Sequence, residues 1–225
     1  MAKDSPYFQF PVKMLASESD TQSLVQNICS YSLWEVSPEQ VETLAKEYID
    51  CHPSLTGLDR NNSEHQIVMA AAERLNVGLS NIASTLSAAQ KMHAKYGVTG
   101  TQCRIRADIA WSAHDDQWPI LKFKVLCGVI AGIGNNQAVK LNHRMIQALA
   151  SGYNSPKGLA ESDMLAKSSV RYWIEQLWFS NFFQHCKRGQ ECWYSISTAS
   201  DQAFAKVVHQ IPTKQRVKTK IDVST

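Results

Sequence analysis

The sequence predicts a mainly α-helical protein with one small β-hairpin, built from two parts that meet near residue 117. Of its 225 residues, 44% are hydrophobic and 19% are charged, which is close to ordinary globular composition. Apolar residues recur at helical spacing along most of the chain. The charges divide unevenly, because residues 1–117 hold nine Lys and Arg against fourteen Asp and Glu, whereas residues 118–225 hold fourteen against six. A basic half beside an acidic half indicates a partner that is a polyanion.

The N-terminal part, residues 1–117, is expected to be a helical module that begins with an extended aromatic arm. Apolar side chains alternate along residues 7–12. Pro11 argues against a central strand, so we expect the arm to dock its aromatic side chains on the body of the protein. An apolar stripe then predicts a helix over residues 20–32.

Two capping boxes predict the next helices. Ser37 to Gln40 and Ser63 to Gln66 both place a serine three residues before a glutamine, as at a helix start. We expect one helix to stop before Pro53, and a second to run from residue 63 to Tyr96, with a possible division at Gly78. Residues 103–109 alternate apolar and charged side chains, which predicts a short strand, with a helix as the alternative.

The C-terminal part, residues 118–212, shows three helical patterns, a hairpin pattern and a fourth helix. Residues 120–133 are apolar almost all round, which is typical of a central core helix. The other expected elements are helices over 141–150, 168–182 and 199–210, and a hairpin over 183–197. Residues 213–225 are expected to form a basic flexible tail.

Three helices followed by a hairpin tipped by Lys187-Arg188-Gly189 resemble the winged-helix class of helix-turn-helix DNA-binding domains. The resemblance rests on the order of the elements, and the connection from residue 150 to 168 is longer than the usual turn. The opening Tyr7 to Pro11, followed by such a domain, is also similar to certain bacterial proteins, a similarity that implies no activity.

The winged-helix resemblance implies a nucleic-acid-binding protein, in which helix 168–182 enters the major groove and the hairpin contacts the flanking backbone. Hydroxyl, amide and cationic side chains are the types that contact phosphates and base edges. The candidate residues are Lys167, Ser168, Ser169, Arg171, Tyr172, Gln176, Lys187, Arg188, Asn142, His143 and Arg144.

The expected role is therefore that of a DNA-binding regulator or replication factor. Double-stranded DNA is the expected nucleic acid. The first alternative is a protein-interaction adaptor that uses Tyr172 and Phe179, and the second is an enzyme of unknown class. The sequence contains no phosphate-binding loop, nucleophile elbow or zinc-protease motif, so we expect no catalytic residue and no cofactor. The N-terminal module is expected to form a homo-oligomer or to bind a protein partner.

The six cysteines include no Cys-x-x-Cys pair. His185, Cys186 and Cys192 are the close cluster, but structural zinc takes four ligands. We therefore expect free thiols and no metal, with zinc and a disulfide across the hairpin as alternatives. The apolar run 125–133 is too short to cross a membrane, and the first residues lack the apolar core of a signal peptide, so we expect a cytoplasmic protein without membrane contact.

Overall fold

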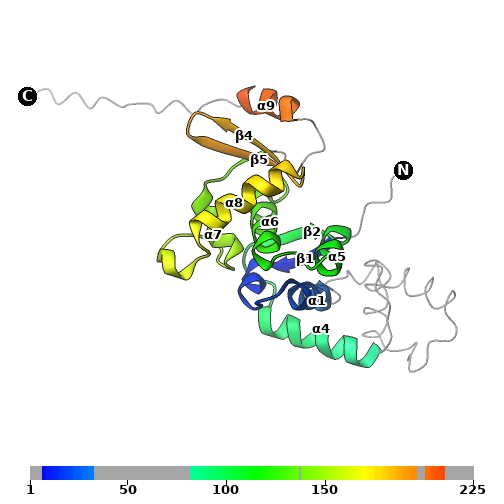
Figure 1. Cartoon of the computed structure of the whole chain (residues 1–225). Helices are drawn as coiled ribbons and strands as arrows, with labels where there is room; N and C mark the ends of the chain where they lie inside the picture. The colour runs from blue at the N-terminus through cyan, green and yellow to red at the C-terminus, as the bar shows by residue number, and fades with distance from the viewer. Residues whose placement is uncertain (1–6, 33–81, 137, 197–200, 211–225) are drawn as a thin grey trace, which may run out of the picture.

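The computed structural model describes residues 7–32, 82–136, 138–196 and 201–210. Within these ranges the chain is mostly helical, with one antiparallel sheet of two strands and one of three. This confirms the expected mainly α-helical class with a small hairpin. Figure 1 shows the hairpin and the last helix at one end of the molecule, and helix α4 at the other. The helices expected between residues 33 and 81 and the expected tail 213–225 lie outside the described residues.

Residues 7–11 are extended and bury aromatic side chains on the body as expected, but they also pair as a strand, which was not expected. Strand β1 (Tyr7–Pro11) runs antiparallel to β2 (Gln102–Arg106), with Tyr7 opposite Arg106. Phe8 and Phe10 are fully buried beneath this two-stranded sheet. Pro11 is tolerated because it is the last residue of β1, where the missing N–H costs little. A 3₁₀ helix, η1 (Val12–Ala16), follows directly.

Helix α1 (Thr21–Ser32) matches the helix expected over 20–32, and α4 (Ile82–Tyr96) is the described end of the helix expected up to Tyr96. The two helices pack against each other. The hydroxyl of Tyr31 donates to the carbonyl of Gly97 at 2.7 Å, and the Tyr31 ring stacks on His93. Gly97 ends α4 with a φ of +56°, which favours glycine.

Residues 103–109 combine both interpretations of their alternating pattern. The strand β2 ends at Arg106, and a helix that the sequence analysis missed, α5 (Ala107–Asp115), begins at once. Asp108 lies in the first turn of α5, where a carboxylate favours the helix over a longer strand. Its side chain also accepts hydrogen bonds from Arg106 and from the backbone N–H of Ile109.

Helix α6 (Ile120–Ile133) is the centre of the fold, as its apolar sequence predicts. Ten of its fourteen residues are buried, and it contacts β2, η1, β5 and two further helices, α7 and α8. Its two lysines are accommodated by specific partners. The Lys124 ammonium donates to the carbonyl of Glu18 at 2.7 Å, and the Lys122 ammonium lies 3.4 Å from the centre of the Trp118 ring.

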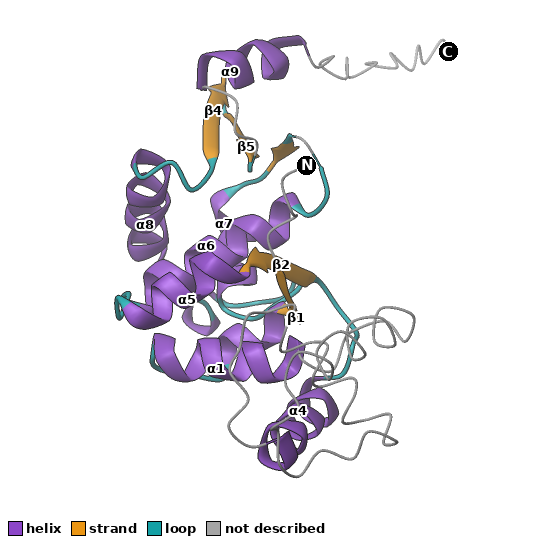
Figure 2. Ribbon diagram, turned by 90° about the vertical axis from the view of Figure 1, so that its right-hand side faces the viewer, coloured by secondary structure: helices purple, strands orange, loops and turns teal. Residues whose placement is uncertain are grey.

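The C-terminal part adds α7 (His143–Ala150), α8 (Lys167–Phe179) and α9 (Asp201–Gln210), with a short 3₁₀ helix, η2 (Glu161–Asp163), before α8. The three-stranded sheet consists of β3 (Val139–Lys140), β4 (Gln184–Arg188) and β5 (Glu191–Ser195), in the order β3-β5-β4. Figure 2 shows α9 beside this hairpin, away from the helical body.

Two expected helices have different ends in the structure, and one short strand was not expected. Helix 168–182 is shorter at its end, because Asn181 adopts a φ of +59° and the N–H of Phe182 turns back to the carbonyl of Leu177. Helix 141–150 begins at His143, since Asn142 is its N-cap. Strand β3 was not expected, because two residues carry no periodic signal.

One continuous core joins side chains from Phe8 to Tyr194, on both sides of residue 117. The division into parts 1–117, 118–212 and 213–225 stays a prediction about folding units. Figures 1 and 2 agree that α6 lies between the β1–β2 sheet and helices α7 and α8.

None of the helices in the described ranges is both long enough and apolar enough to cross a bilayer.

The close approach of α6 and α7 at Gly128 predicts a large effect of adding one methyl group. A β-carbon at Gly128 would lie 2.9 Å from the backbone nitrogen of Ala150, which cannot move without shifting α7. At Gly132 the nearest atom is the end of the Leu141 side chain, which can rotate away. Alanine gains about 1 kcal/mol of helix propensity at both positions. We expect Gly128→Ala to lower the free energy of unfolding by about 1–3 kcal/mol, since overpacking outweighs propensity.

The matched variant Gly132→Ala should change the free energy of unfolding by less than about 1 kcal/mol. Urea denaturation of both variants measures the difference. Equal stability of the two variants would show that the α6–α7 contact is looser than described.

Candidate nucleic-acid interface

Helix α8 presents the expected residues on its outer side. Val170, Ile174 and Leu177 are buried against the core, as the inward stripe predicts. The opposite side carries exposed basic, polar and aromatic side chains from the candidate set, with Ser169 half-buried at its edge. The exposed candidates are Lys167, Ser168, Arg171, Tyr172 and Gln176.

His143, the first residue of α7, lies where α8 and the hairpin meet. Its half-buried position lowers its pKa chiefly by desolvation. The positive charges of Arg171, Lys187 and Lys167 lower it further, whereas Glu175 raises it. These effects require the charges to lie close to the histidine ring. Cations from two separate elements, α8 and β4, therefore converge on the start of α7.

Lys187 faces α8 because of its place in the hairpin register. Side chains alternate along a strand, so Lys187 and His185 lie on the same face of the hairpin. Their cross-strand partners, Cys192 and Tyr194, lie on that face too. This face is turned toward α8, since the His185 ring meets the Trp178 ring edge-on at 5.4 Å. Lys187 is exposed and makes no ion pair with any described residue.

Arg188, next along the strand, faces the other way and has a structural contact. Its guanidinium donates to the carbonyl of Val208 in α9 at 3.0 Å, and it is only half-exposed. The sequence analysis grouped Arg188 with Lys187 as a backbone contact. The register separates them, since Lys187 points to the α8 side and Arg188 holds α9 against the hairpin.

Two candidates at α7 also have partners within the protein. The Asn142 side chain accepts a hydrogen bond from the backbone N–H of Met145 at 2.7 Å, which makes it the N-cap of α7. Arg144 donates to the carbonyl of Leu159 at 3.1 Å and holds the loop before α8. Both side chains remain exposed, but their first role is to position α7 and α8.

The cluster of His185, Cys186 and Cys192 does not converge. His185 and Cys192 lie on the face toward α8, and Cys186 lies on the face toward α9. The two cysteines are therefore on opposite faces of the hairpin, which excludes a disulfide between them, and both are free thiols. Within the described ranges no three His, Cys, Asp or Glu side chains are grouped to hold a metal ion.

Negative charge is present at this surface but is matched locally. Glu175 lies one helical turn after Arg171, with 3.4 Å between the carboxylate and the guanidinium. Glu191 is paired with Lys140 of β3, a cation that the sequence analysis missed because it did not detect the strand. Lys167 forms no ion pair within the part of the chain that the structure describes. The surplus charge on this face is positive.

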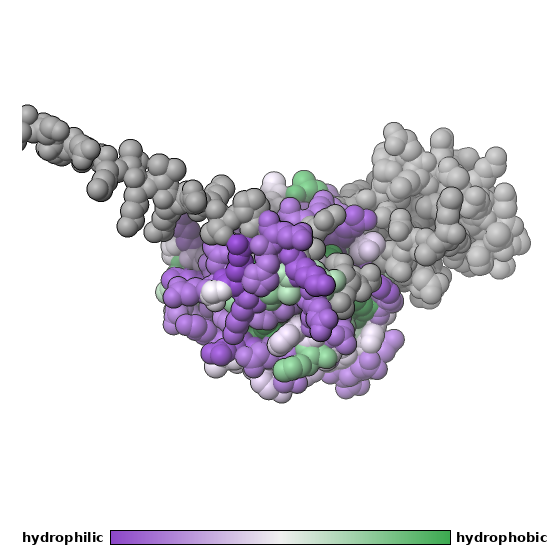
Figure 3. Space-filling model, turned by 90° about the horizontal axis from the view of Figure 1, so that it is seen from above, coloured by the Kyte–Doolittle hydropathy of each residue, from purple (hydrophilic) through white to green (hydrophobic). Residues whose placement is uncertain are grey.

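The hairpin end of the molecule is mostly hydrophilic. Figure 3 looks onto this end and shows hydrophobic side chains only in small, separate spots among the described residues. A small cavity of about 300 Å³ lies between the start of α7 and the hairpin turn, lined by Asn142, His143 and Gln190 among others. Positive and polar groups, rather than an apolar patch, therefore dominate this surface.

Comparison of the chain with protein-family models, with curated protein sequences and with solved structures found no match.

The lowered pKa of His143 and of His185 predicts an acid-sensitive fold. Burial is the largest cause for both, followed by the charge of neighbouring cations. In the unfolded chain both histidines bind protons at the ordinary pKa of about 6.5, whereas in the folded protein their pKa is lower. Stability is therefore complete above that pH and is lost as the pH falls below it. We expect the melting temperature to decrease between about pH 7.5 and pH 5.5.

Replacing His143 or His185 by glutamine should make the melting temperature less dependent on pH. Each replacement removes one histidine whose protonation the folded state disfavours. His209, exposed on α9, is the matched control, and His209→Gln should keep the wild-type profile. Thermal melts at several pH values measure all four proteins. A decrease that is identical in all of them would assign the acid sensitivity to other groups.

Proposed function

We propose that this protein binds double-stranded DNA through the outer side of α8 and the α8-facing side of the hairpin. The observation that carries the proposal is the set of exposed cations on facing elements: Lys167 and Arg171 on α8, and Lys187 on the α8-facing side of the hairpin. Cations clustered on one face attract the phosphate backbone, which supplies most of the affinity in such complexes. A chain with a basic second half supports the same partner.

The topology of the C-terminal part supports a winged-helix arrangement. The order is α6, β3, α7, α8 and then the hairpin β4–β5. The short strand β3 pairs with β5, so the hairpin is joined to the start of α7 through backbone hydrogen bonds. In helix-turn-helix domains the recognition helix follows a supporting helix, and its first residues approach the bases. By this analogy α8 is the recognition helix and α7 supports it.

The first turn of α8 is suited to bind a phosphate. Its N-cap, Ala166, makes no side-chain cap, so the first backbone N–H groups are open to an anion. Lys167 and Ser168 are exposed at the same point. Arg171 and Gln176 lie further along and have the side chains that read guanine and adenine edges. We assign phosphate contacts to Lys167, Ser168 and Lys187, and base contacts to Arg171, in the N-terminal half of α8, and to Gln176.

A protein partner is the second candidate, because two aromatic residues on α8 are open to solvent. The Phe179 side chain is 70% exposed and the Tyr172 side chain is 52% exposed. They are seven residues apart, so they lie on the same side of the helix. Aromatic residues of this kind often anchor protein interfaces. We also propose that the DNA-binding protein acts as a regulator or a replication factor. Its N-terminal part would form a homo-oligomer or bind a protein partner.

Removing charge from the cluster should weaken DNA binding and reduce its salt dependence. We expect Lys167→Gln with Lys187→Gln to lower the log–log salt slope by about 1 for each lost phosphate contact. Lys91→Gln is the matched control, since Lys91 is an exposed lysine on α4, at the other end of the molecule (Figure 1). The full chain is used, because its core continues across residue 117.

Titration of random duplex DNA at two salt concentrations measures these slopes. If the wild type binds no duplex, or if Lys91→Gln matches the double variant, the proposal fails. The protein partner would then be tested by a pull-down that compares the wild type with the Tyr172→Ala/Phe179→Ala variant, which keeps the charge cluster.

Arg171 should differ from the lysines, because its guanidinium can contact a guanine edge with two hydrogen bonds. In the free protein it bonds weakly to Glu175, and DNA competes with that contact. We expect Arg171→Lys to keep the salt slope but to lose about 1–3 kcal/mol of preference at one base position. Binding selection on a random duplex library measures that preference. An unchanged preference would make Arg171 a phosphate contact only.

A further inference from the structure

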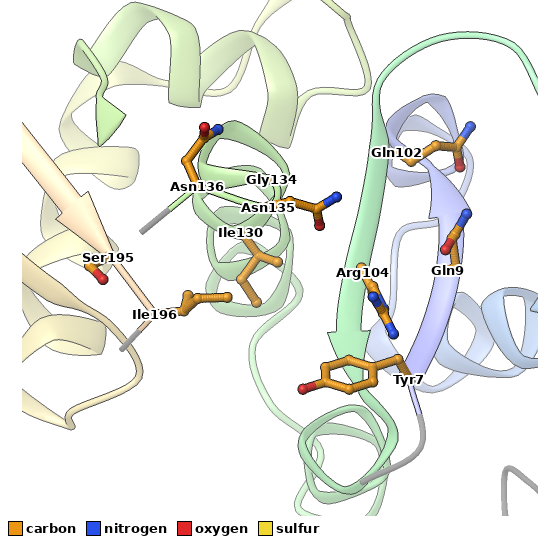
Figure 4. A pocket seen from close by; sticks show the side chains of 10 residues that line it. All are labelled: Tyr7, Gln9, Gln102, Arg104, Ile130, Gly134, Asn135, Asn136, Ser195 and Ile196. Carbon is orange, nitrogen blue, oxygen red and sulfur yellow. The ribbon is translucent and has the colours of Figure 1, made fainter. Parts of the chain in front are cut away.

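A second cavity lies on the other side of α6 from α8, and its lining has a different chemistry. It has a volume of about 690 Å³ and is formed by the outer face of the β1–β2 sheet, the end of α6 and the end of β5. Figure 4 shows Tyr7 and Arg104 on the sheet side, with Ile130 and Ile196 opposite. Cavities of this size hold small organic molecules.

Among the described residues that line this cavity, Arg104 is the one that carries a charge. Its guanidinium lies over the Tyr7 ring, 4.6 Å from the ring centre, and it makes no ion pair with any described residue. Two residues along the same strand, Arg106 is paired with Asp108. A guanidinium held on an aromatic ring, with its N–H groups unused by a carboxylate, is suited to bind an anion.

The remaining polar lining consists mainly of carboxamides. Gln9 and Gln102 contribute from the sheet, and Asn135 contributes from the turn after α6. The Gln102 side chain donates to the carbonyl of Val98, but its own carbonyl oxygen is buried without a partner among the described residues. The cavity therefore offers a cation and amide groups to a ligand.

The turn that carries Asn135 depends on Gly134. This residue has a φ of +56° and a ψ of −133°, a conformation that side chains with a β-carbon rarely adopt. It ends α6 and lets the Asn135 side chain point toward the cavity (Figure 4), whereas the Asn136 side chain donates to the carbonyl of Ile133. The backbone is thus arranged so that polar side chains, rather than a continued helix, form this wall.

We propose that the cavity binds a small planar organic anion with hydrogen-bonding groups on its edge. Arg104 contacts the anionic group, the carboxamides contact the polar edge, and Ile130 and Ile196 cover the flat apolar body. An inorganic dianion has no flat apolar body, so it makes only the contact with Arg104. A neutral planar molecule lacks that contact. The site is separate from α8, so it does not depend on the proposed DNA binding.

The test uses the full chain and six probes: the four nucleoside 5′-monophosphates, orotate and benzoate. Adenosine and inorganic phosphate are the comparison compounds, since the first lacks the anion and the second lacks the planar body. Titration is followed by NMR shifts of the amide side chains that line the cavity. We expect at least one probe to bind more tightly than both comparison compounds.

Arg104→Gln should weaken that binding by about tenfold, the size expected for one charge-assisted hydrogen bond. The matched control Arg106→Gln, which removes the neighbouring paired arginine, should stay within about twofold of the wild type. No shift with any of the six probes, equal binding of adenosine, or equal loss in both variants would each overturn the proposal. The Lys167→Gln and Lys187→Gln variant should bind the probe normally, which keeps this result distinct from the DNA experiment.

Discussion

The burial of α6 is the constraint on which the rest of the structure depends. A helix that is apolar on every side must be covered on every side, and α6 is covered by α7, α8, η1 and strands from both sheets. The cover comes from segments that are far apart in the sequence. Burying this one helix therefore brings the two halves of the chain into a single core. Its two lysines are compatible with that position because a backbone carbonyl and an indole ring receive them.

The same helix separates two surfaces of different chemistry. On one side the start of α7, α8 and the hairpin gather cations around His143. On the other side the end of α6 and the β1–β2 sheet form a cavity with one arginine and several carboxamides. We propose an extended polyanion as the partner of the first surface and a small organic anion as the ligand of the second. Strand β5 reaches both, since Cys192 lies near the first and Ser195 lines the second.

The sequence predicted most of the described helices but missed α5. Periodic apolar residues report which face of a helix is buried. The core helix 120–133 and the outward residues of α8 were predicted for that reason. Short elements were missed: β3 has two residues, and pairing of β1 with β2 depends on a partner about ninety residues away. The different roles of Lys187 and Arg188 follow from hairpin register, which adjacent basic residues do not reveal. The cavity beside Arg104 was missed entirely, because its lining comes from four separate segments.

The hydrogen bond from Arg188 to the carbonyl of Val208 has a consequence for the chain that follows. It fixes the last turn of α9 next to the hairpin. Four cations occur between residues 214 and 220. Under the proposed binding of a polyanion by α8, the covalent link to α9 would let these cations contact the same polyanion without the cost of a separate encounter. The hydrogen bond from Arg188 to Val208 would then join the two contacts.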